Sequence, residues 1–578
     1  MHCARAQRMT SRLRPSFSVA ATLTALVAAA SCVNGPFPTL PSNDGGDSSH
    51  EASDARATND TRATNDATGH DAPRQAGPDV AQAMSGVSDA GQDSAPPDDL
   101  IDNRAPQQDG GSQADAAPEV APPPSDFFVS PSGGAGVFTT ITAAIAAANS
   151  SAAATRTIHV AAGTYSAQSG ETFPLVVRGV ALSGAGPTAT IIQGAGIVPA
   201  MLAAKVDVDD RLTSGLVTSS LLIGDEVGTT TIEHLTVEPS PPGALVGSQG
   251  ITCNRGVTRS AGPAATLNTI VDDVVVASFE VAVRVTASSL NGATSGCSLS
   301  LTRSTLESGS LGVAADGLMN ADGTPQQRVA VHVGDGTSAG ADTIHDFSIA
   351  VNAPDAFGGA DVSIRDGVAD ASITFAQLSS SDQGVIAIAS MEDAGAGLDV
   401  EHSDISGIDN VGILLQGPVQ VSALSDNSIH AVSTMPVEDW VGYGLAVVAT
   451  TSSPVVHGVR RNNFFGNDVA VGILSATTPL ADTLDFGTAQ DSGLNVFRCN
   501  RSPVSRSDGA GQALMYGYGA DIIVDVPLGP PTLAIPFEGN VWDQVPPTTT
   551  DIITLGPTVD ATKATAASAP ACPAGRSP

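Results

Sequence analysis

Short strands broken by tight turns, repeated along most of the chain, restrict the fold more than any other feature. Four such strands are expected close together, at Thr157–Val160, Leu175–Val177, Val180–Leu182 and Ile191–Ile192. A turn is expected at Ala-Gly-Thr-Tyr, where Gly163 relieves the backbone. Strands this short and this close cannot each cross a wide sandwich. They can form the sides of successive coils in a parallel β-solenoid.

The repeat continues far beyond this region. Leu378, Ile405, Ile429 and Phe464 occupy equivalent places in four strand–turn units, at steps of 27, 24 and 35 residues. Periods in this range indicate stacked supersecondary units with loop insertions. A large antiparallel sandwich or a propeller is the alternative. A propeller would show tighter regularity and aromatic signatures, whereas aromatic residues make up only 4% of this chain.

One short amphipathic helix precedes the strands. Ile141, Ala144, Ile145 and Ala148 lie at helical spacing, and Thr139 or Thr140 is the expected N-cap. We expect this helix to cover the N-terminal end of the solenoid, because an open end would expose unpaired strand edges.

The N-terminus is typical of an exported protein. Four arginines precede an apolar run from Phe17 to Ala30, which is too short to span a bilayer comfortably and suits a signal peptide. The run ends Ala29-Ala30-Ser31-Cys32 and resembles the bacterial lipoprotein cleavage box, although Leu is usual where Ala29 stands. This predicts a signal peptide over 1–31, lipidation of Cys32 and membrane attachment through the lipid. An ordinary cleaved signal peptide is the alternative, and either Met1 or Met9 could be the start. Val33 stands where an inner-membrane retention Asp would be, so we expect the outer membrane or cell surface.

A low-complexity segment follows. Residues 33–125 hold 16 acidic and 4 basic residues and few large apolar ones, so they cannot bury enough surface to fold. We therefore expect a disordered acidic linker over 32–125, a β-helix domain over 126–545 and a C-terminal tail over 546–578. The formal net charge of −34 argues against nucleic acid as a partner.

Two motifs carry a resemblance to a known family. "GTYS" with "GETFPL" (Gly163–Ser166 and Gly170–Leu175), and later "LDFGTAQDSGLNVFRCN" (Leu484–Asn500) with "EGNVWDQ" (Glu538–Gln544), resemble domain-of-unknown-function family 1565. The resemblance spans about 126–545, with divergent insertions. It implies a right-handed, single-stranded parallel β-helix of the pectin-lyase-like superfamily, an envelope or surface location and a possible link to carbohydrate. It implies no established reaction.

Candidate chemistry is sparse. The patch Asp207, Asp209 and Asp210 offers Ca²⁺ ligands, but no second ligand set is evident and a solvated surface is the preferred interpretation. We therefore expect no cofactor, with Ca²⁺ as the weak alternative.

Other residues imitate parts of known sites. Asp272, Asp273 and His457 imitate parts of a galacturonase pattern, yet adjacent strand residues point to opposite faces unless a turn intervenes. Arg460 and Arg461 suggest a solvated turn. Corner asparagines are expected to tolerate left-handed geometry and to stack in ladders: Asn410, Asn427, Asn463 and Asn467.

Four cysteines remain after Cys3 and Cys32. In an exported chain Cys253, Cys297, Cys499 and Cys572 suggest two disulfides, with Cys253–Cys297 and Cys499–Cys572 the local choice of three pairings. Free buried thiols are the alternative.

The leading functional hypothesis is a non-catalytic surface protein that binds a polysaccharide or other envelope proteins, or that has a structural role. The alternative is a polysaccharide-degrading lyase or glycoside hydrolase. Fold resemblance alone does not decide between them.

Overall fold

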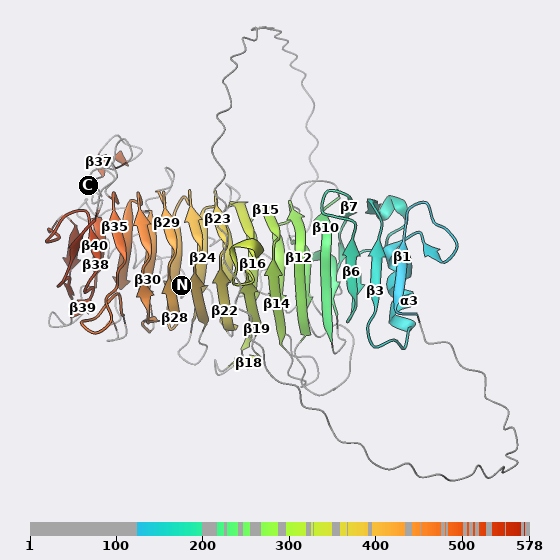
Figure 1. The fold of residues 1–578 in the computed structure, drawn as a ribbon, viewed down its shortest axis with the longest axis horizontal. Coiled ribbons are helices and arrows are strands. Elements are labelled where there is room, and N and C mark those ends of the chain that lie inside the picture. Colours follow the sequence, from blue (N-terminus) through green and yellow to red (C-terminus); the bar gives the residue numbers. More distant parts are fainter. Residues whose placement is uncertain are drawn as a thin grey trace, which may run out of the picture. The chain divides into compact units, whose positions relative to one another are not determined.

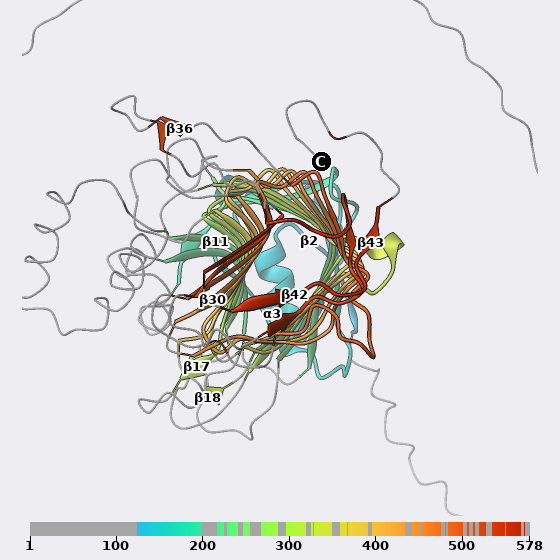
Figure 2. The same cartoon turned by 90° about the vertical axis from the view of Figure 1, so that its left-hand side faces the viewer.

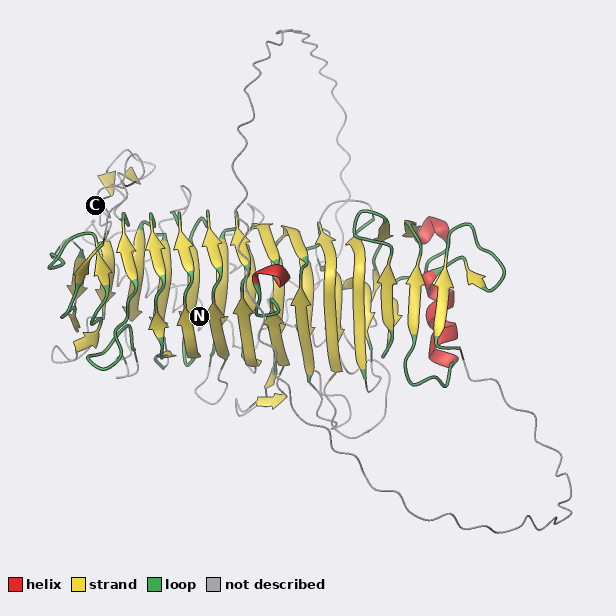
Figure 3. Cartoon of the chain, viewed as in Figure 1, coloured by secondary structure: helices red, strands yellow, loops and turns green. Residues whose placement is uncertain are grey.

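Parallel strands stacked coil upon coil dominate the part of the chain that the structure, a computed structural model, describes (Figure 1, Figure 3). The described residues are 124–198, 217–224, 228–240, 247–254, 267–286, 296–319, 325–327, 329–348, 359–366, 368–390, 396–433, 442–450, 452–475, 480, 484–500, 506–507, 513–514, 520–526, 534–549, 551–555, 557–567 and 572. Within these ranges, no helix has the length and apolar character needed to cross a bilayer.

The first side of each coil builds one column of parallel strands. It comprises β1 (Asp126–Val129), β3 (Thr157–Val160), β6 (Ala181–Gly184), β14 (Cys297–Thr302), β19 (Val329–Val333), β22 (Val368–Thr374), β25 (Gly397–Glu401), β28 (Gln420–Ser425), β31 (Val455–Val456) and β32 (Val459–Arg460). Two longer strands, β10 (Thr229–Glu238) and β12 (Leu267–Ala277), run on from this column into the second, so both columns belong to one hydrogen-bonded sheet.

The second column follows after a sharp corner. It comprises β4 (Gly163–Ser166), β7 (Thr190–Gln193), β15 (Thr305–Gly309), β20 (Thr343–Phe347), β23 (Gln377–Ser379), β26 (Asp404–Ser406), β29 (Ser428–His430), β33 (Asn463–Phe465), β35 (Val496–Arg498), β40 (Val541–Trp542) and β43 (Thr565–Ala566). Its pairings place Leu378, Ile405, Ile429 and Phe464 directly above one another. The equivalence expected from the sequence is therefore confirmed, because the buried position recurs once per coil.

The third column closes each coil. It comprises β5 (Leu175–Val177), β9 (Thr218–Ile223), β11 (Ser248–Asn254), β13 (Val281–Thr286), β16 (Leu311–Asp316), β21 (Ala360–Ile364), β24 (Gln383–Ile388), β27 (Val411–Gln416), β30 (Tyr443–Ala449), β34 (Val469–Ser475), β38 (Ala520–Asp525) and β41 (Ile552–Leu555). All residues of β30 and β34 are buried, which matches their predominantly apolar sequences. Strands β41 and β43 lie past the expected boundary at residue 545 and pair with β38 and β40.

These pairings confirm the expected parallel β-helix. They also correct one local prediction, since Gly163-Thr164-Tyr165 is not a turn but part of strand β4. Gly163 is needed there for two reasons: its φ is +152°, and a Cβ would lie 2.8 Å from Cγ of Pro131.

Helix α3 (Ile141–Ser150) closes the N-terminal end, and lies within the outline of the coils when viewed along the stack (Figure 2). Its buried residues are the four expected ones, and Thr140 is the N-cap. The carboxylate of Glu171 accepts the N–H groups of Ile141 and Thr142 over 2.7 and 2.9 Å, so a buried side chain from the next coil caps the helix.

The corner between the first and second columns needs left-handed backbone. In eight coils one residue there has φ between 52° and 59°: His234, Asp273, Arg303, Phe375, His402, Asp426, Arg461 and Leu494. The corner between β19 and β20 differs, with Gly334 at φ of 86° and an inserted segment at 335–341. Each of the eight side chains points outward, and the residue that follows points into the core. This is an uncommon conformation for residues other than glycine, and it turns the chain sharply without an insertion.

The inward residues in the later coils form an asparagine ladder. Asn462 donates its backbone N–H and its Nδ2 to Oδ1 of Asn495, both over 3.0 Å, and Asn495 repeats this with Asn540 over 2.9 Å. Asn427 starts the ladder on the preceding coil. Ladder formation was expected for Asn427, but the left-handed residue is the one before each asparagine and not the asparagine itself.

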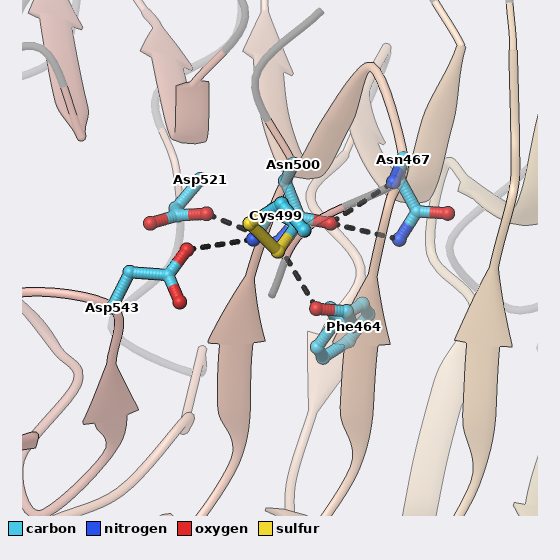
Figure 4. Close-up of a disulfide and its surroundings, with 7 residues drawn as sticks. Phe464, Asn467, Cys499, Asn500, Asp521 and Asp543 are labelled. Atoms are coloured by element: carbon cyan, nitrogen blue, oxygen red, sulfur yellow. Dashed lines mark hydrogen bonds between the residues drawn. A yellow bond between two sulfur atoms is a disulfide. The ribbon is translucent and has the colours of Figure 1, made fainter. Parts of the chain in front are cut away.

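A second, shorter ladder lies at the next corner (Figure 4). Asn467 donates its backbone N–H and Nδ2 to Oδ1 of Asn500 over 3.1 and 3.2 Å, and Asn500 donates to Asp521 over 3.0 Å. Of the other expected ladder residues, Asn463 lies half-buried on β33, and the buried Oδ1 of Asn410 has no hydrogen-bond partner among the described residues. Neither belongs to a ladder.

Candidate functional site

Seven of the left-handed corner residues carry charged or aromatic side chains directed outward, and these are here called the corner ridge: His234, Asp273, Arg303, Phe375, His402, Asp426 and Arg461. Each member comes from a different coil, and neighbouring coils are about 4.8 Å apart. One coil, that of β19 and β20, contributes no member and separates Arg303 from Phe375. The ridge is therefore a row of charged and aromatic groups in two parts, placed by backbone geometry.

The first part of the ridge is an ion-pair cluster. Nδ1 of His234 lies 2.7 Å from Oδ2 of Asp273. Next to it, both oxygens of Asp272 accept hydrogen bonds from the guanidinium of Arg303, whose side chain is 51% exposed, and Thr302 donates over 2.7 Å. Burial alone would raise the pKa of Asp272, but Arg303 and Thr302 outweigh it and hold that pKa below the usual range.

Asp272 and Asp273 correct an expectation from the sequence. Adjacent strand residues should face opposite sides, yet both carboxylates lie on the outside. The reason is that Asp273 has φ of 53°, so the corner interrupts the strand alternation at this position. The residue types of the galacturonase-like pattern are only partly assembled, because His457 is exposed on a different coil and does not join them.

The second part of the ridge combines aromatic rings with another ion pair. The rings of Phe375 and His402 stack, with centroids 4.8 Å apart and planes inclined by 16°. One coil further on, the guanidinium of Arg461 donates to both oxygens of Asp426 over 2.8 and 2.6 Å. This bidentate pair holds the pKa of Asp426 below its ordinary value.

This geometry is poorly suited to general acid catalysis. Glycoside hydrolysis needs a carboxylic acid that keeps its proton and reaches the substrate. Asp272 and Asp426 are held ionised by arginine. Burial does raise the pKa of Asp342 and Asp361, but both side chains are buried inside the solenoid. The carboxylates of the two arginine pairs on the ridge are therefore poorly suited to act as general acids.

Asp342 makes folding depend on pH. Burial raises its pKa to about 7, against the hydrogen bonds from the N–H groups of Ser304 and Gly334. The folded chain therefore holds this proton more tightly than the unfolded chain, and the free energy of unfolding falls as pH rises from about 4 to about 7.

Replacing Asp342 with asparagine should flatten that dependence, with a difference on the order of 2–4 kcal/mol across the window. Urea unfolding of wild-type and Asp342→Asn protein at several pH values between about 4 and 8 measures it. Equal slopes in the two proteins would show that Asp342 is ionised throughout.

Arg460 and Arg461, which were predicted to form a solvated turn, lie in different environments. Arg461 is half-exposed and belongs to the ridge. Arg460 is only 6% exposed, and its guanidinium binds Asp485 and Asp491 over 2.8 and 2.9 Å. The expectation is wrong for Arg460, which fastens the loop after Leu484 to the preceding coil.

The residues that carry the family resemblance also have structural roles, as Arg460 does. Glu171 caps helix α3, Asn495 and Asn540 belong to the first ladder, and Trp542 packs in the core against Phe497 with ring centroids 4.8 Å apart. These motifs therefore maintain coil geometry, and they do not by themselves specify a ligand or a reaction.

The other candidate residues have simple outcomes. Cys32, Asp207, Asp209 and Asp210 lie outside the described residues. The structure pairs Cys253 with Cys297 and Cys499 with Cys572, with Cα–Cα distances of 6.3 and 5.5 Å. Sequence reasoning missed the corner ridge. A partial signal is the residue before Ser or Asn at four of its corners, as in Arg303-Ser304 and His402-Ser403.

Comparison with known proteins gives one local family match and several solved structures of similar architecture. A family model described as a protein of unknown function, DUF1565, matches residues 133–213. No curated protein matches the chain.

Several solved structures are similar in architecture. The A-module of mannuronan C-5 epimerase AlgE6 from Azotobacter vinelandii is 14% identical, covers 74% of this chain and 95% of its own, and gives a TM-score of 0.28. The complex of XylC with xylose is 10% identical, with coverage of 76% and 86% and a TM-score of 0.34. The catalytic domain of a GH87 alpha-1,3-glucanase in complex with tetrasaccharides is 13% identical, with coverage of 66% and 70% and a TM-score of 0.26. At these values the likenesses carry no argument about ligand or activity.

Proposed function

We propose that this protein is a non-catalytic glycan-binding protein of the cell envelope, exported and anchored through a lipid on Cys32. In this proposal the acidic segment 32–125 is a tether, and the corner ridge is the binding surface. The observation that carries it is the outward ring pair of Phe375 and His402, placed in the same row as two arginine–carboxylate pairs.

Chemistry favours a neutral polysaccharide as the ligand. The partly exposed ring of Phe375 gives an apolar platform for the C–H face of a sugar. Carboxylates and guanidinium groups held in bidentate pairs are fixed in orientation and keep edges that can exchange hydrogen bonds with hydroxyl groups. A polyanionic chain would be repelled by a net charge of −34. A row that repeats from coil to coil suits a polymer of repeating units.

Removing the ring tests this proposal. Phe375→Ala should weaken retention on a neutral polysaccharide about tenfold, equivalent to about 1.4 kcal/mol, because the stacking platform is lost. Affinity electrophoresis of the full-length chain through gels containing plant and bacterial polysaccharides measures the effect. Polymers with and without uronic acids should both be included.

A matched control is available in the first coils. Phe128 and His159 also stack, with centroids 5.0 Å apart and planes inclined by 18°, but they lie on β1 and β3 away from the ridge. Phe128→Ala should leave retention unchanged. Equal loss in both variants, or retention only on uronic acid polymers, would contradict the ridge as a neutral-glycan surface.

A polysaccharide-degrading lyase or glycoside hydrolase is the second candidate function. Incubating the same polymers with and without Ca²⁺ and assaying new reducing or unsaturated ends decides between the two, since cleavage of any polymer would overturn the non-catalytic proposal.

A further inference from the structure

The C-terminal end of the solenoid holds a cluster of metal-ligating atoms that glycan binding does not use. The two sulfur atoms of the Cys499–Cys572 disulfide and a carboxylate oxygen of Asp543 all lie within 4.8 Å of one another. Figure 4 shows Asp543 directed toward Cys499 from the neighbouring strand. Within the described residues, no other group of three histidine, cysteine or acidic side chains meets this spacing.

The backbone fixes the carboxylate beside the sulfur. Oδ2 of Asp543 accepts the N–H of Cys499 over 2.6 Å. Cys499 has φ of 57° at its corner, and it is followed by Asn500, which is tied into the second ladder. Cys499 and Asp543 are thus joined by a hydrogen bond that does not involve the disulfide.

Reduction would change what these atoms can bind. A dithiol or phosphine reductant supplies two electrons and the S–S bond takes up two protons, giving two thiols and the oxidised reductant. A divalent cation that binds both sulfurs then displaces the two thiol protons to solvent. Two thiolates and one carboxylate are ligands that Zn²⁺ accepts in tetrahedral geometry, with Zn–S distances of about 2.3 Å.

We propose that reduction of the Cys499–Cys572 disulfide creates a site for a thiophilic divalent cation such as Zn²⁺, ligated by both thiolates and by Asp543. In that geometry the sulfurs need to separate to only about 3.7 Å, which a side-chain rotation can supply. Cys499 is buried while Asp543 and Cys572 are partly exposed, so water reaches the fourth position. The strongly negative net charge raises the local cation concentration further.

Cys499 and Cys572 would then be linked in both redox states, by a disulfide or by a bound cation. Cys572 lies 73 residues after Cys499 in sequence, and the disulfide attaches the last part of the chain to the β35 corner. In an oxidising environment the attachment is covalent. In a reducing environment the bound cation holds the same two cysteines together.

Cobalt is a suitable probe because its thiolate complexes absorb in the near ultraviolet. The full-length chain is reduced with a phosphine, freed of reductant under inert gas, and titrated with Co²⁺. We expect thiolate-to-cobalt absorption at one Co²⁺ per chain in the reduced protein and none in the oxidised protein. Cys499→Ser should abolish the band. Asp543→Asn should weaken Co²⁺ binding at least tenfold, and its amide oxygen can still accept the Cys499 N–H.

The other disulfide supplies the matched control. The double variant Cys253→Ser and Cys297→Ser should keep the band at full intensity. A second measurement needs no variant. Zn²⁺ should protect Cys572 of the reduced wild-type chain from alkylation, and the masses of the proteolytic peptides identify which cysteines are alkylated. The proposal is overturned if the reduced protein gives no band, if the band survives Cys499→Ser, or if Zn²⁺ leaves Cys572 fully reactive.

Discussion

Asn495→Ala is expected to cost on the order of 3–6 kcal/mol in the free energy of unfolding, more than any surface substitution in this chain. Oδ1 of Asn495 accepts two hydrogen bonds from Asn462, and its Nδ2 donates to the carbonyl of Val459 over 2.9 Å and to Asn540. All these groups are buried, so removing the amide leaves several of them without partners. Urea unfolding followed by circular dichroism measures the change.

Asn463 provides the comparison for this prediction. It is the residue after Asn462, but its side chain points outward from β33 and is half-buried. Asn463→Ala should change the free energy of unfolding by less than about 0.5 kcal/mol. In a solenoid each coil contacts only its neighbours, so the loss of stability should be largest in the coils next to Asn495. Trp542 lies in the core of the next coil. Its fluorescence should therefore change at a lower urea concentration in Asn495→Ala than in Asn463→Ala. Identical unfolding of the two variants would exclude a buried ladder.

Glu171→Ala is the second substitution with a large expected effect. One carboxylate oxygen accepts the N–H of Ile141, and the other accepts the N–H and the hydroxyl of Thr142 over 2.9 and 2.6 Å. Hydrogen bonds to a charged group contribute about 1.5–3 kcal/mol each, so the loss should be on the order of 3–5 kcal/mol. Helix α3 covers the N-terminal end of the core, and its detachment would expose strand edges.

Two measurements separate local from global damage at Glu171. Thermal unfolding should report the loss of stability, and light scattering should report association of chains through the uncovered end. Thr140→Ala, which removes only the N-cap bond to Ala143, should cost about 1 kcal/mol and leave the protein monodisperse. Glu233→Ala, on the outer face of β10, should have little effect. A Glu171→Ala protein as stable as Glu233→Ala would show that α3 is held by its apolar face alone.

The strand repeat was predictable because burial imposes a period. The steps between Leu378, Ile405, Ile429 and Phe464 differ, yet all four stand in register on the second column. Insertions leave the coil without disturbing the buried position, so unequal spacing did not hide the repeat. The same reasoning predicted the buried face of α3, since its four inward residues follow helical spacing.

The corner ridge was not predictable in this way. Alternation placed Asp272 and Asp273 on opposite faces, but one left-handed residue put both outside. Phe375 and His402 are 27 residues apart, and neither local sequence predicts that their rings stack. The same holds for Arg460, whose buried contacts with Asp485 and Asp491 come from a different coil.

The sequence by itself determined the coil, the covering helix and the identity of the residues that repeat, because each follows from local spacing and the burial of apolar side chains. Only the tertiary structure decided which polar groups meet. Residues one coil apart are 23 to 51 positions apart in this chain, and their contact depends on the backbone conformation at every corner between them. Ladders, ion pairs and the ridge exist because left-handed corners bring the same position of each coil into line, which no local pattern specifies.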